Sequence, residues 1–154
     1  MTNAQKYTIL VKLGFMMIID IRKLNAQKLY TGSMEFEYSA PKELIEIPFV
    51  AFVGAVKVQF DYELYEDNSI ELRGSVSYTL EGQCSRCLEK ASAQVKGELD
   101  AYFEPRKDSE DYSYSGGIVD LTKAVNDAIM ASMPYLLTCK DDCEGLSYSD
   151  KPTN

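Results

Sequence analysis

Apolar and polar residues alternate in the centre of the chain, over residues 56–64 and again over 70–80. Strict alternation is typical of β-strands that bury one face and expose the other. The apolar positions of the first stretch are Val56, Val58, Phe60, Tyr62 and Leu64, and those of the second, with one glycine among them, are Ile70, Leu72, Gly74, Val76, Tyr78 and Leu80. Residues 66–69, Glu-Asp-Asn-Ser, separate the two stretches. The pattern therefore predicts two long strands joined by a hairpin turn.

Two further strands are predicted on either side of this hairpin. One begins after Leu88 and ends at Pro105, with Val95, Leu99 and Phe103 suited to its buried side. The other covers residues 18–24, where isoleucines alternate with Asp20 and Arg22. Consecutive strands with short connections favour an antiparallel meander with one face in water, and such a sheet can be open or barrel-like.

A helical pattern follows, over residues 119–133. Its apolar positions recur at the three- and four-residue spacing of an amphipathic helix. They are Leu121, Ala124, Val125, Ala128, Ile129 and Met133. Asp120 is placed to be the N-cap and Pro134 to end the helix. The fold class predicted is α+β: an antiparallel sheet, a C-terminal helix packed on it, and a cysteine-rich C-terminal tail. The polar residues 106–117 are expected to be a surface loop.

Charge is distributed unevenly along the 154 residues, and the whole chain carries a net charge of −8. Residues 1–30 hold five basic residues and one acid, which gives +4, whereas residues 31–154 hold eleven and twenty-three, which gives −12. Phosphate affinity comes from lysine and arginine, so an acidic body is a poor general binder of nucleic acid. Any contact with nucleic acid is expected to be local or made through another protein.

No stretch approaches the roughly 18 consecutive apolar residues of a membrane span, and Lys12 interrupts the apolar N-terminal segment. We expect no signal peptide and a cytoplasmic location, where disulfides are rare. The chain contains no histidine, no G-x-S-x-G, no H-E-x-x-H and no phosphate-binding glycine loop. Because no set of residues assembles a catalytic site, a non-enzymatic role is expected.

Four cysteines form two close pairs, Cys84 with Cys87 and Cys139 with Cys143, with 51 residues between the pairs. Two short-spaced pairs brought together by a fold are typical of a tetrahedral, all-thiolate zinc site. Four protein ligands would leave no position for water, so this zinc would be structural. Three alternatives remain from the spacing alone: two disulfides, a thioredoxin-like redox pair at Cys84 and Cys87, and four reduced thiols without metal.

Three segments together resemble the bacterial YceD family, the large ribosomal RNA subunit accumulation proteins. They are "IDIRKL", "GQCSRCLE" and "VDLTKAVNDAIMASMPYLLTCKDDCEGL". The positions that carry the resemblance are Cys84, Arg86, Cys87, Asp120, Leu121, Pro134, Cys139, Cys143, Gly145 and Leu146. It covers about residues 16–148, which we expect to form a single domain. Residues 1–15 are expected to be an N-terminal extension upstream of the native start, and residues 149–154 a disordered tail.

The resemblance implies a role in the synthesis, processing or accumulation of 23S ribosomal RNA, and hence in large-subunit assembly. It implies as partner a ribosomal protein or an rRNA-processing factor, or the 23S rRNA precursor itself, with no membrane and no small-molecule substrate. Two other functions stay open. One is a thiol-based redox or metal sensor that uses the C-x-x-C pair. The other is direct RNA binding through the basic N-terminal residues Lys6, Lys12, Arg22, Lys23 and Lys28.

Overall fold

A seven-stranded sheet forms the body of the protein. The computed structural model describes residues 8–9, 17–105 and 112–139. The strands of the sheet are β1 (Thr8–Ile9), β3 (Thr31–Tyr38), β4 (Val50–Phe52), β5 (Val56–Leu64), β6 (Ile70–Gln83), β7 (Lys90–Glu104) and β8 (Tyr112–Ser113). Their order is β1-β3-β5-β6-β7-β8, with β4 paired to β6. Strands β3, β5, β6 and β7 pair antiparallel, whereas the short end strands β1 and β8 pair parallel.

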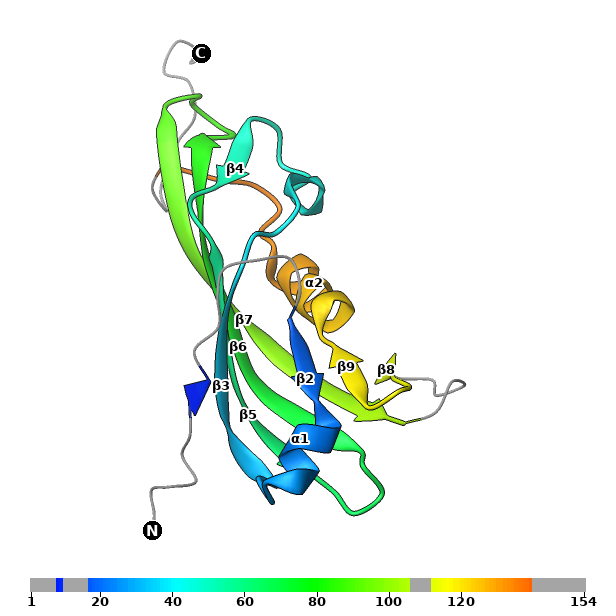
Figure 1. The fold of residues 1–154 in the computed structure, drawn as a ribbon. Helices are drawn as coiled ribbons and strands as arrows, with labels where there is room; N and C mark the ends of the chain where they lie inside the picture. The colour runs from blue at the N-terminus through cyan, green and yellow to red at the C-terminus, as the bar shows by residue number, and fades with distance from the viewer. Residues whose placement is uncertain (1–7, 10–16, 106–111, 140–154) are drawn as a thin grey trace, which may run out of the picture.

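One face of this sheet is covered by a second layer (Figure 1). The layer contains the two-stranded sheet of β2 (Ile18–Asp20) and β9 (Ile118–Asp120), the helix α1 (Ile21–Ala26) and the helix α2 (Thr122–Ser132). A 3-10 helix, η2 (Lys42–Leu44), lies in the connection from β3 to β4. The predicted α+β class, with one helix packed on an antiparallel sheet, is confirmed. The barrel-like alternative is wrong: among the described residues β1 and β8, at the two ends of the strand order, do not pair, so the sheet is open.

The predicted hairpin is confirmed. Leu64 pairs with Ile70 at the end of the ladder, and the turn is closed by hydrogen bonds from Tyr65 N to Ser69 O (2.8 Å) and from Asn68 N to Tyr65 O (2.9 Å). Asn68 adopts a φ of 70°, a left-handed conformation that asparagine tolerates better than most residues. Every second residue of β5 is buried, as the alternation predicts. The third predicted strand is β7.

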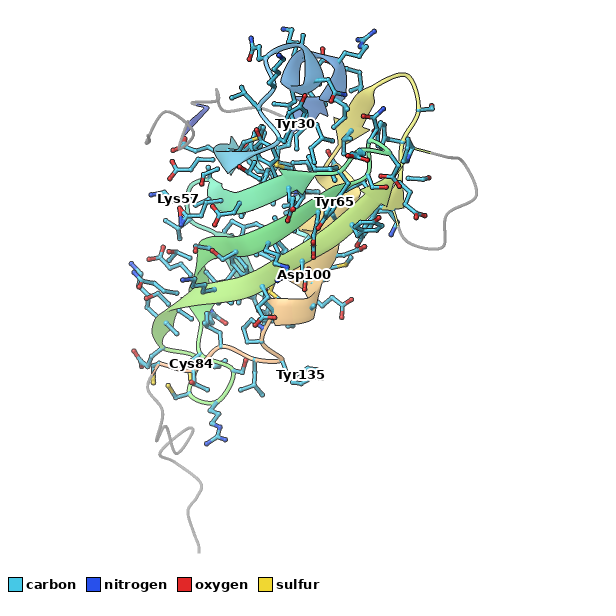
Figure 2. All side chains as sticks on the ribbon, turned by 90° about the horizontal axis from the view of Figure 1, so that it is seen from below. Tyr30, Lys57, Tyr65, Cys84, Asp100 and Tyr135 are labelled. Carbon is cyan, nitrogen blue, oxygen red and sulfur yellow. The ribbon has the colours of Figure 1, made fainter. Side chains whose placement is uncertain are left out.

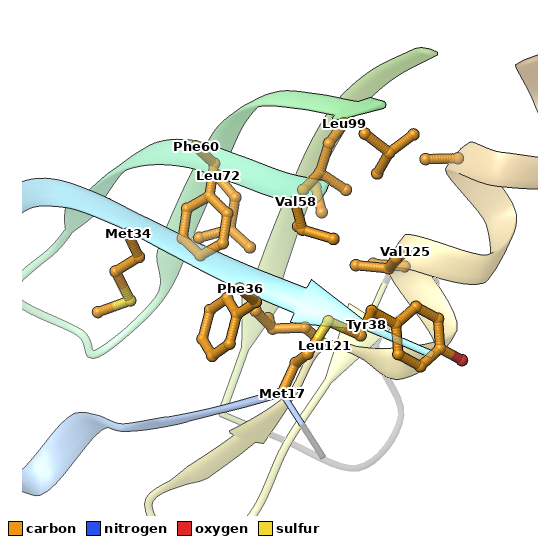
Figure 3. Packing of buried hydrophobic residues seen from close by; sticks show 14 of the residues in the cluster. Met17, Met34, Phe36, Tyr38, Val58, Phe60, Leu72, Leu99, Leu121 and Val125 are labelled. Carbon is orange, nitrogen blue, oxygen red and sulfur yellow. The ribbon is translucent and has the colours of Figure 1, made fainter. Parts of the chain in front are cut away.

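The main hydrophobic core lies between the two layers (Figure 3). Phe36 of β3 stacks with Phe60 of β5, with ring centroids 6.0 Å apart. On the helix side, the buried residues of α2 are Ala124, Val125, Ala128 and Ile129, which belong to the predicted stripe. The open face of the sheet carries the polar residues of the alternating pattern, as expected for an antiparallel sheet layered on one side only.

The prediction of a strand over residues 18–24 is wrong beyond Asp20. β2 ends at Asp20, and α1 begins at Ile21. The Asp20 carboxylate is the N-cap: its Oδ1 accepts hydrogen bonds from the backbone N–H groups of Arg22 (3.0 Å) and Lys23 (3.3 Å). These bonds satisfy N–H groups that have no partner within the first helical turn, which favours the helix over a continued strand.

The start of α2 differs slightly from the prediction. The N-cap position is Leu121, and Asp120 is the last residue of β9. Asp120 nevertheless caps the helix, because its Oδ1 accepts a hydrogen bond from the Thr122 N–H (2.9 Å). The helix ends at Ser132, two residues before Pro134.

Part of the predicted surface loop 106–117 is ordered into the sheet. Tyr112–Ser113 forms β8, which pairs with Phe103 and Glu104 of β7; residues 106–111 lie outside the described residues. The predicted domain limits, including the N-terminal extension 1–15 and the tail 149–154, stay predictions. None of the helices in the described residues has the length and apolarity to cross a membrane.

Replacing Tyr112 by phenylalanine is expected to destabilise the protein in a pH-dependent way. The Tyr112 hydroxyl donates to Asp127 Oδ2 at 2.7 Å. This bond, assisted by Lys123, holds the pKa of the Asp127 carboxyl below its usual 3.8. A lowered pKa stabilises the fold above the unfolded pKa, and this stabilisation is lost as pH falls through the folded pKa.

The melting-temperature difference between Tyr112→Phe and the wild type should therefore be largest near neutral pH and shrink below about pH 4. The phenylalanine ring keeps the packing on Phe103, whose centroid lies 5.1 Å from that of Tyr112. Thermal unfolding across a pH series measures the difference, and a difference that does not change with pH would count against this role of the hydroxyl.

Candidate metal centre

The first cysteine pair lies in the turn between β6 and β7. Cys84 N donates to Glu89 O (2.7 Å) and Leu88 N donates to Cys84 O (2.9 Å), which closes the turn. Leu88 adopts a φ of 68°, rare for a bulky residue. Inside the turn, the N–H groups of Arg86 and Cys87 point at Cys84 Sγ, at 3.4 and 3.5 Å. N–H groups directed at a sulfur favour its thiolate form, which is the form that binds metal.

The segment that follows α2 returns to this turn (Figure 1). Ser85 N donates to Leu137 O at 2.6 Å, and Leu137 N donates to Ser85 Oγ at 3.3 Å. In Figure 2, the exposed Tyr135 lies at the same end of the molecule as Cys84. The two hydrogen bonds hold residue 137 against the turn and so bring Cys139 to the first cysteine pair.

A second, smaller hydrophobic cluster supports this arrangement. Cys84, Ala91 and Leu137 are buried against one another, and Val50 of β4 and Ala93 of β7 pack on them. Cys84 is fully buried and Leu137 is 1% exposed. Burial of the Leu137 side chain contributes about 2 kcal/mol to holding the segment in place.

Three of the four predicted ligands meet. The Sγ atoms of Cys84, Cys87 and Cys139 all lie within 4.8 Å of one another, and Cys87 Sγ is 3.5 Å from Cys139 Sγ. Tetrahedral zinc with Zn–S bonds of about 2.3 Å places its sulfurs roughly 3.8 Å apart, so this donor set fits a tetrahedral thiolate site. Cys143, the fourth predicted ligand, lies outside the described residues.

Two of the alternative interpretations of the cysteines fit this geometry poorly. Thioredoxin-like pairs are found near a βαβ unit, but Cys84 and Cys87 lie in a turn between two antiparallel strands. For the two-disulfide alternative, Cys84, Cys87 and Cys139 are free thiols in the structure, and Cys143 lies outside the described residues. The cluster is compatible with a bound metal ion.

Two residues that build the site were not identified from the sequence. In the sequence, Leu137 is only one residue of a short apolar run after the helix, and Ser85 is only the residue between Cys84 and Arg86. Their mutual hydrogen bonds link positions 52 residues apart. Nothing in a local pattern predicts such a contact, although the cysteine spacing itself indicated that the two segments meet.

Leu137→Ala is expected to weaken metal binding although Leu137 is not a ligand. The substitution removes most of the apolar contact that positions Cys139 and leaves a small cavity beside Cys84, at a cost of about 2–4 kcal/mol. Competition with a chromogenic chelator measures the affinity. Leu136→Ala, at the neighbouring 48% exposed side chain, is the matched control and should bind metal as the wild type does; equal affinity in all three proteins would contradict the positioning role.

The family to which the chain belongs follows from a comparison of the sequence. The model of the family described as "Large ribosomal RNA subunit accumulation protein YceD" matches residues 72–153, just over half of the chain. The match contains β6 from Leu72 on, β7, α2 and all four cysteines, whereas the "IDIRKL" segment lies outside it. No curated protein and no solved structure matched the chain. On the strength of this match, the chain belongs to the YceD family.

Proposed function

We propose that this protein is a non-enzymatic, cytoplasmic factor that supports 23S rRNA synthesis, processing or accumulation and thereby large ribosomal subunit assembly. The family description, which links YceD proteins to accumulation of the large-subunit RNA, carries the proposal. The partner would be a ribosomal protein, an rRNA-processing factor or the 23S rRNA precursor. A chain with a net charge of −8 is suited to basic partners such as ribosomal proteins.

Depletion of the protein tests this function. We expect immature 23S rRNA to accumulate and the protein to co-sediment with precursors of the large subunit. Small-subunit 16S rRNA, measured in the same cells, serves as the internal control and should mature normally. If depletion leaves the 23S profile unchanged, the proposed function is wrong.

We further propose that Cys84, Cys87, Cys139 and Cys143 hold one structural zinc ion. The proximity of three Sγ atoms and the N–H groups directed at Cys84 Sγ support this assignment. Bound zinc would cross-link the β6–β7 turn to the C-terminal segment and would have no catalytic role. Elemental analysis of protein purified without a metal-affinity step is expected to give one zinc per chain, and metal-free protein with wild-type stability would contradict it.

A redox or metal sensor is the second candidate. It is favoured by the 3.5 Å approach of Cys87 Sγ to Cys139 Sγ, since Cys139 is exposed. Burial of Cys84 works against the simplest version, a reversible Cys84–Cys87 disulfide, because an oxidant has little access to that sulfur. Thiol titration separates the two: four thiols that react only after chelation indicate structural zinc, and a disulfide formed and reduced reversibly indicates a sensor.

A further inference from the structure

Two strands share one edge of β6. Residues 70–77 of β6 pair with β5, and residues 80–82 pair with β4. Between them the chain crosses from β4 to β5 through Val53–Gly54–Ala55, and Val53 N donates to Thr79 O at 2.8 Å. At this seam the open face of the sheet has a hollow of about 490 Å³.

The side chains that line the hollow from the open face are two cations and three neutral polar groups, and Ala55, Tyr78 and Val95 complete the lining. Its lining residues with side chains on the open face are Lys57, Ser77, Thr79, Gln94 and Lys96. Ser77 is the cross-strand partner of both lysines, of Lys57 on β5 and of Lys96 on β7. The two lysines therefore lie on either side of Ser77, which is half-buried, and no carboxylate is among the described residues that line the hollow.

Neither lysine is neutralised by an acid of the described chain. Arg73 and Lys90, on the same face, form ion pairs with Glu71 (2.8 Å) and Glu81 (3.8 Å). Lys57 and Lys96 form none with the described residues, although Glu37 is the cross-strand neighbour of Lys57 and Glu98 lies two residues beyond Lys96.

The rest of this face is acidic toward the β5–β6 turn. Figure 2 labels Lys57 on β5 and Asp100 on β7, which lie along the strands of this face. Among the described residues, the acids between the hollow and the turn are Glu35, Asp61, Glu63, Glu71, Glu98 and Asp100, and the one cation there is Arg73. The hollow is thus a local basic position on an otherwise acidic surface.

We propose that the hollow between Lys57 and Lys96 binds a phosphate group, and that the phosphate belongs to the backbone of a single-stranded RNA segment. Ammonium groups and hydroxyls are the donors that phosphate oxygens accept, and such contacts need no base recognition. The surrounding acids repel the flanking phosphates, so binding is confined to a short segment. The RNA assignment rests on the proposed function; the phosphate site itself does not.

The test is the double variant Lys57→Gln/Lys96→Gln, measured by fluorescence anisotropy with a labelled twelve-nucleotide single-stranded RNA. Wild-type protein should bind at low salt, and the variant should bind about tenfold more weakly. Loss of this one phosphate contact also makes the slope of log K against log[salt] shallower by about 0.7. The control is Lys42→Gln/Lys90→Gln, which removes the same charge at two exposed lysines outside the hollow and outside the basic N-terminal segment.

The proposal is overturned if wild-type protein does not bind phosphate in any form, or if the control loses as much affinity as the test variant. Competition by inorganic pyrophosphate distinguishes the sources. If the wild-type protein binds pyrophosphate but not RNA, and the double variant loses the pyrophosphate binding, the phosphate site is supported and the RNA assignment is wrong. The depletion experiment tests the proposed function separately. If that function is wrong, 23S rRNA matures normally after depletion, whatever the double variant binds.

Discussion

Cys84→Ser is expected to abolish metal binding and to lower the melting temperature by about 10 °C. The substitution removes a ligand sulfur and places a hydroxyl in a fully buried position between Ala91 and Leu137. Loss of a structural metal removes folding free energy directly, and a buried, poorly paired hydroxyl costs roughly 1–3 kcal/mol more. A loss near 3 kcal/mol corresponds to about 10 °C in a chain of this size.

Cys139→Ser is the matched control for this substitution. It also removes one sulfur, but at an exposed position, so it should lose the metal while costing less stability than Cys84→Ser. Metal content by elemental analysis and melting by circular dichroism measure both effects. If both variants keep a full complement of metal, the three-cysteine cluster is not the metal site.

Gly74→Ala is expected to have the second-largest effect, a destabilisation of about 3 kcal/mol. A Cβ at this position would overlap the backbone carbonyl oxygen of Gln59 and the Cα of Phe60, and would lie 2.7 Å from Phe60 Cβ. These atoms belong to β5, which pairs with β6 at this position. Because backbone atoms cannot rotate away, the two strands must separate locally or shift.

Gly116→Ala separates this steric effect from simple backbone strain. Its added methyl group meets nothing within 4 Å, but Gly116 has a φ of 72°, and an alanine in that conformation costs only about 1–2 kcal/mol. Urea unfolding of both variants gives the comparison. Gly74→Ala should be clearly less stable than Gly116→Ala. If both variants lose the same free energy of unfolding, strands β5 and β6 can move apart at Gly74 at little cost, and the steric argument is wrong.

The elements with regular patterns were predictable. Alternation over nine residues identified β5, and the three- and four-residue spacing identified α2, because each pattern records a buried face. The strand predicted over residues 18–24 failed at Ile21, since four alternating residues also fit the start of a helix. The distinguishing feature is Asp20, whose carboxylate caps the N–H groups two and three positions later, those of Arg22 and Lys23.

Contacts between distant segments were harder to predict. Strands β4 and β5 share one edge of β6 because Val50–Phe52 pairs with residues 80–82. No periodicity in the sequence predicts that pairing. The cysteine spacing was the exception, because metal chemistry requires the ligands to meet wherever the chain places them. The docking of Leu137 on Ser85, which brings Cys139 into place, had no comparable rule.

The length of β6 has a consequence for hydrogen exchange. Its first part lies in the main core with β5, and its last residues lead directly into the cysteine cluster beside β4. This end can open when its pairing with β4 and with residues 90–93 of β7 breaks and Leu137 leaves the cysteine turn, while the pairing of residues 70–77 with β5 stays intact. Amide protons of residues 80–83 would then exchange through a smaller unfolding unit than those of residues 70–77. A single continuous strand would thus report two opening free energies, and metal binding would raise the lower of them selectively.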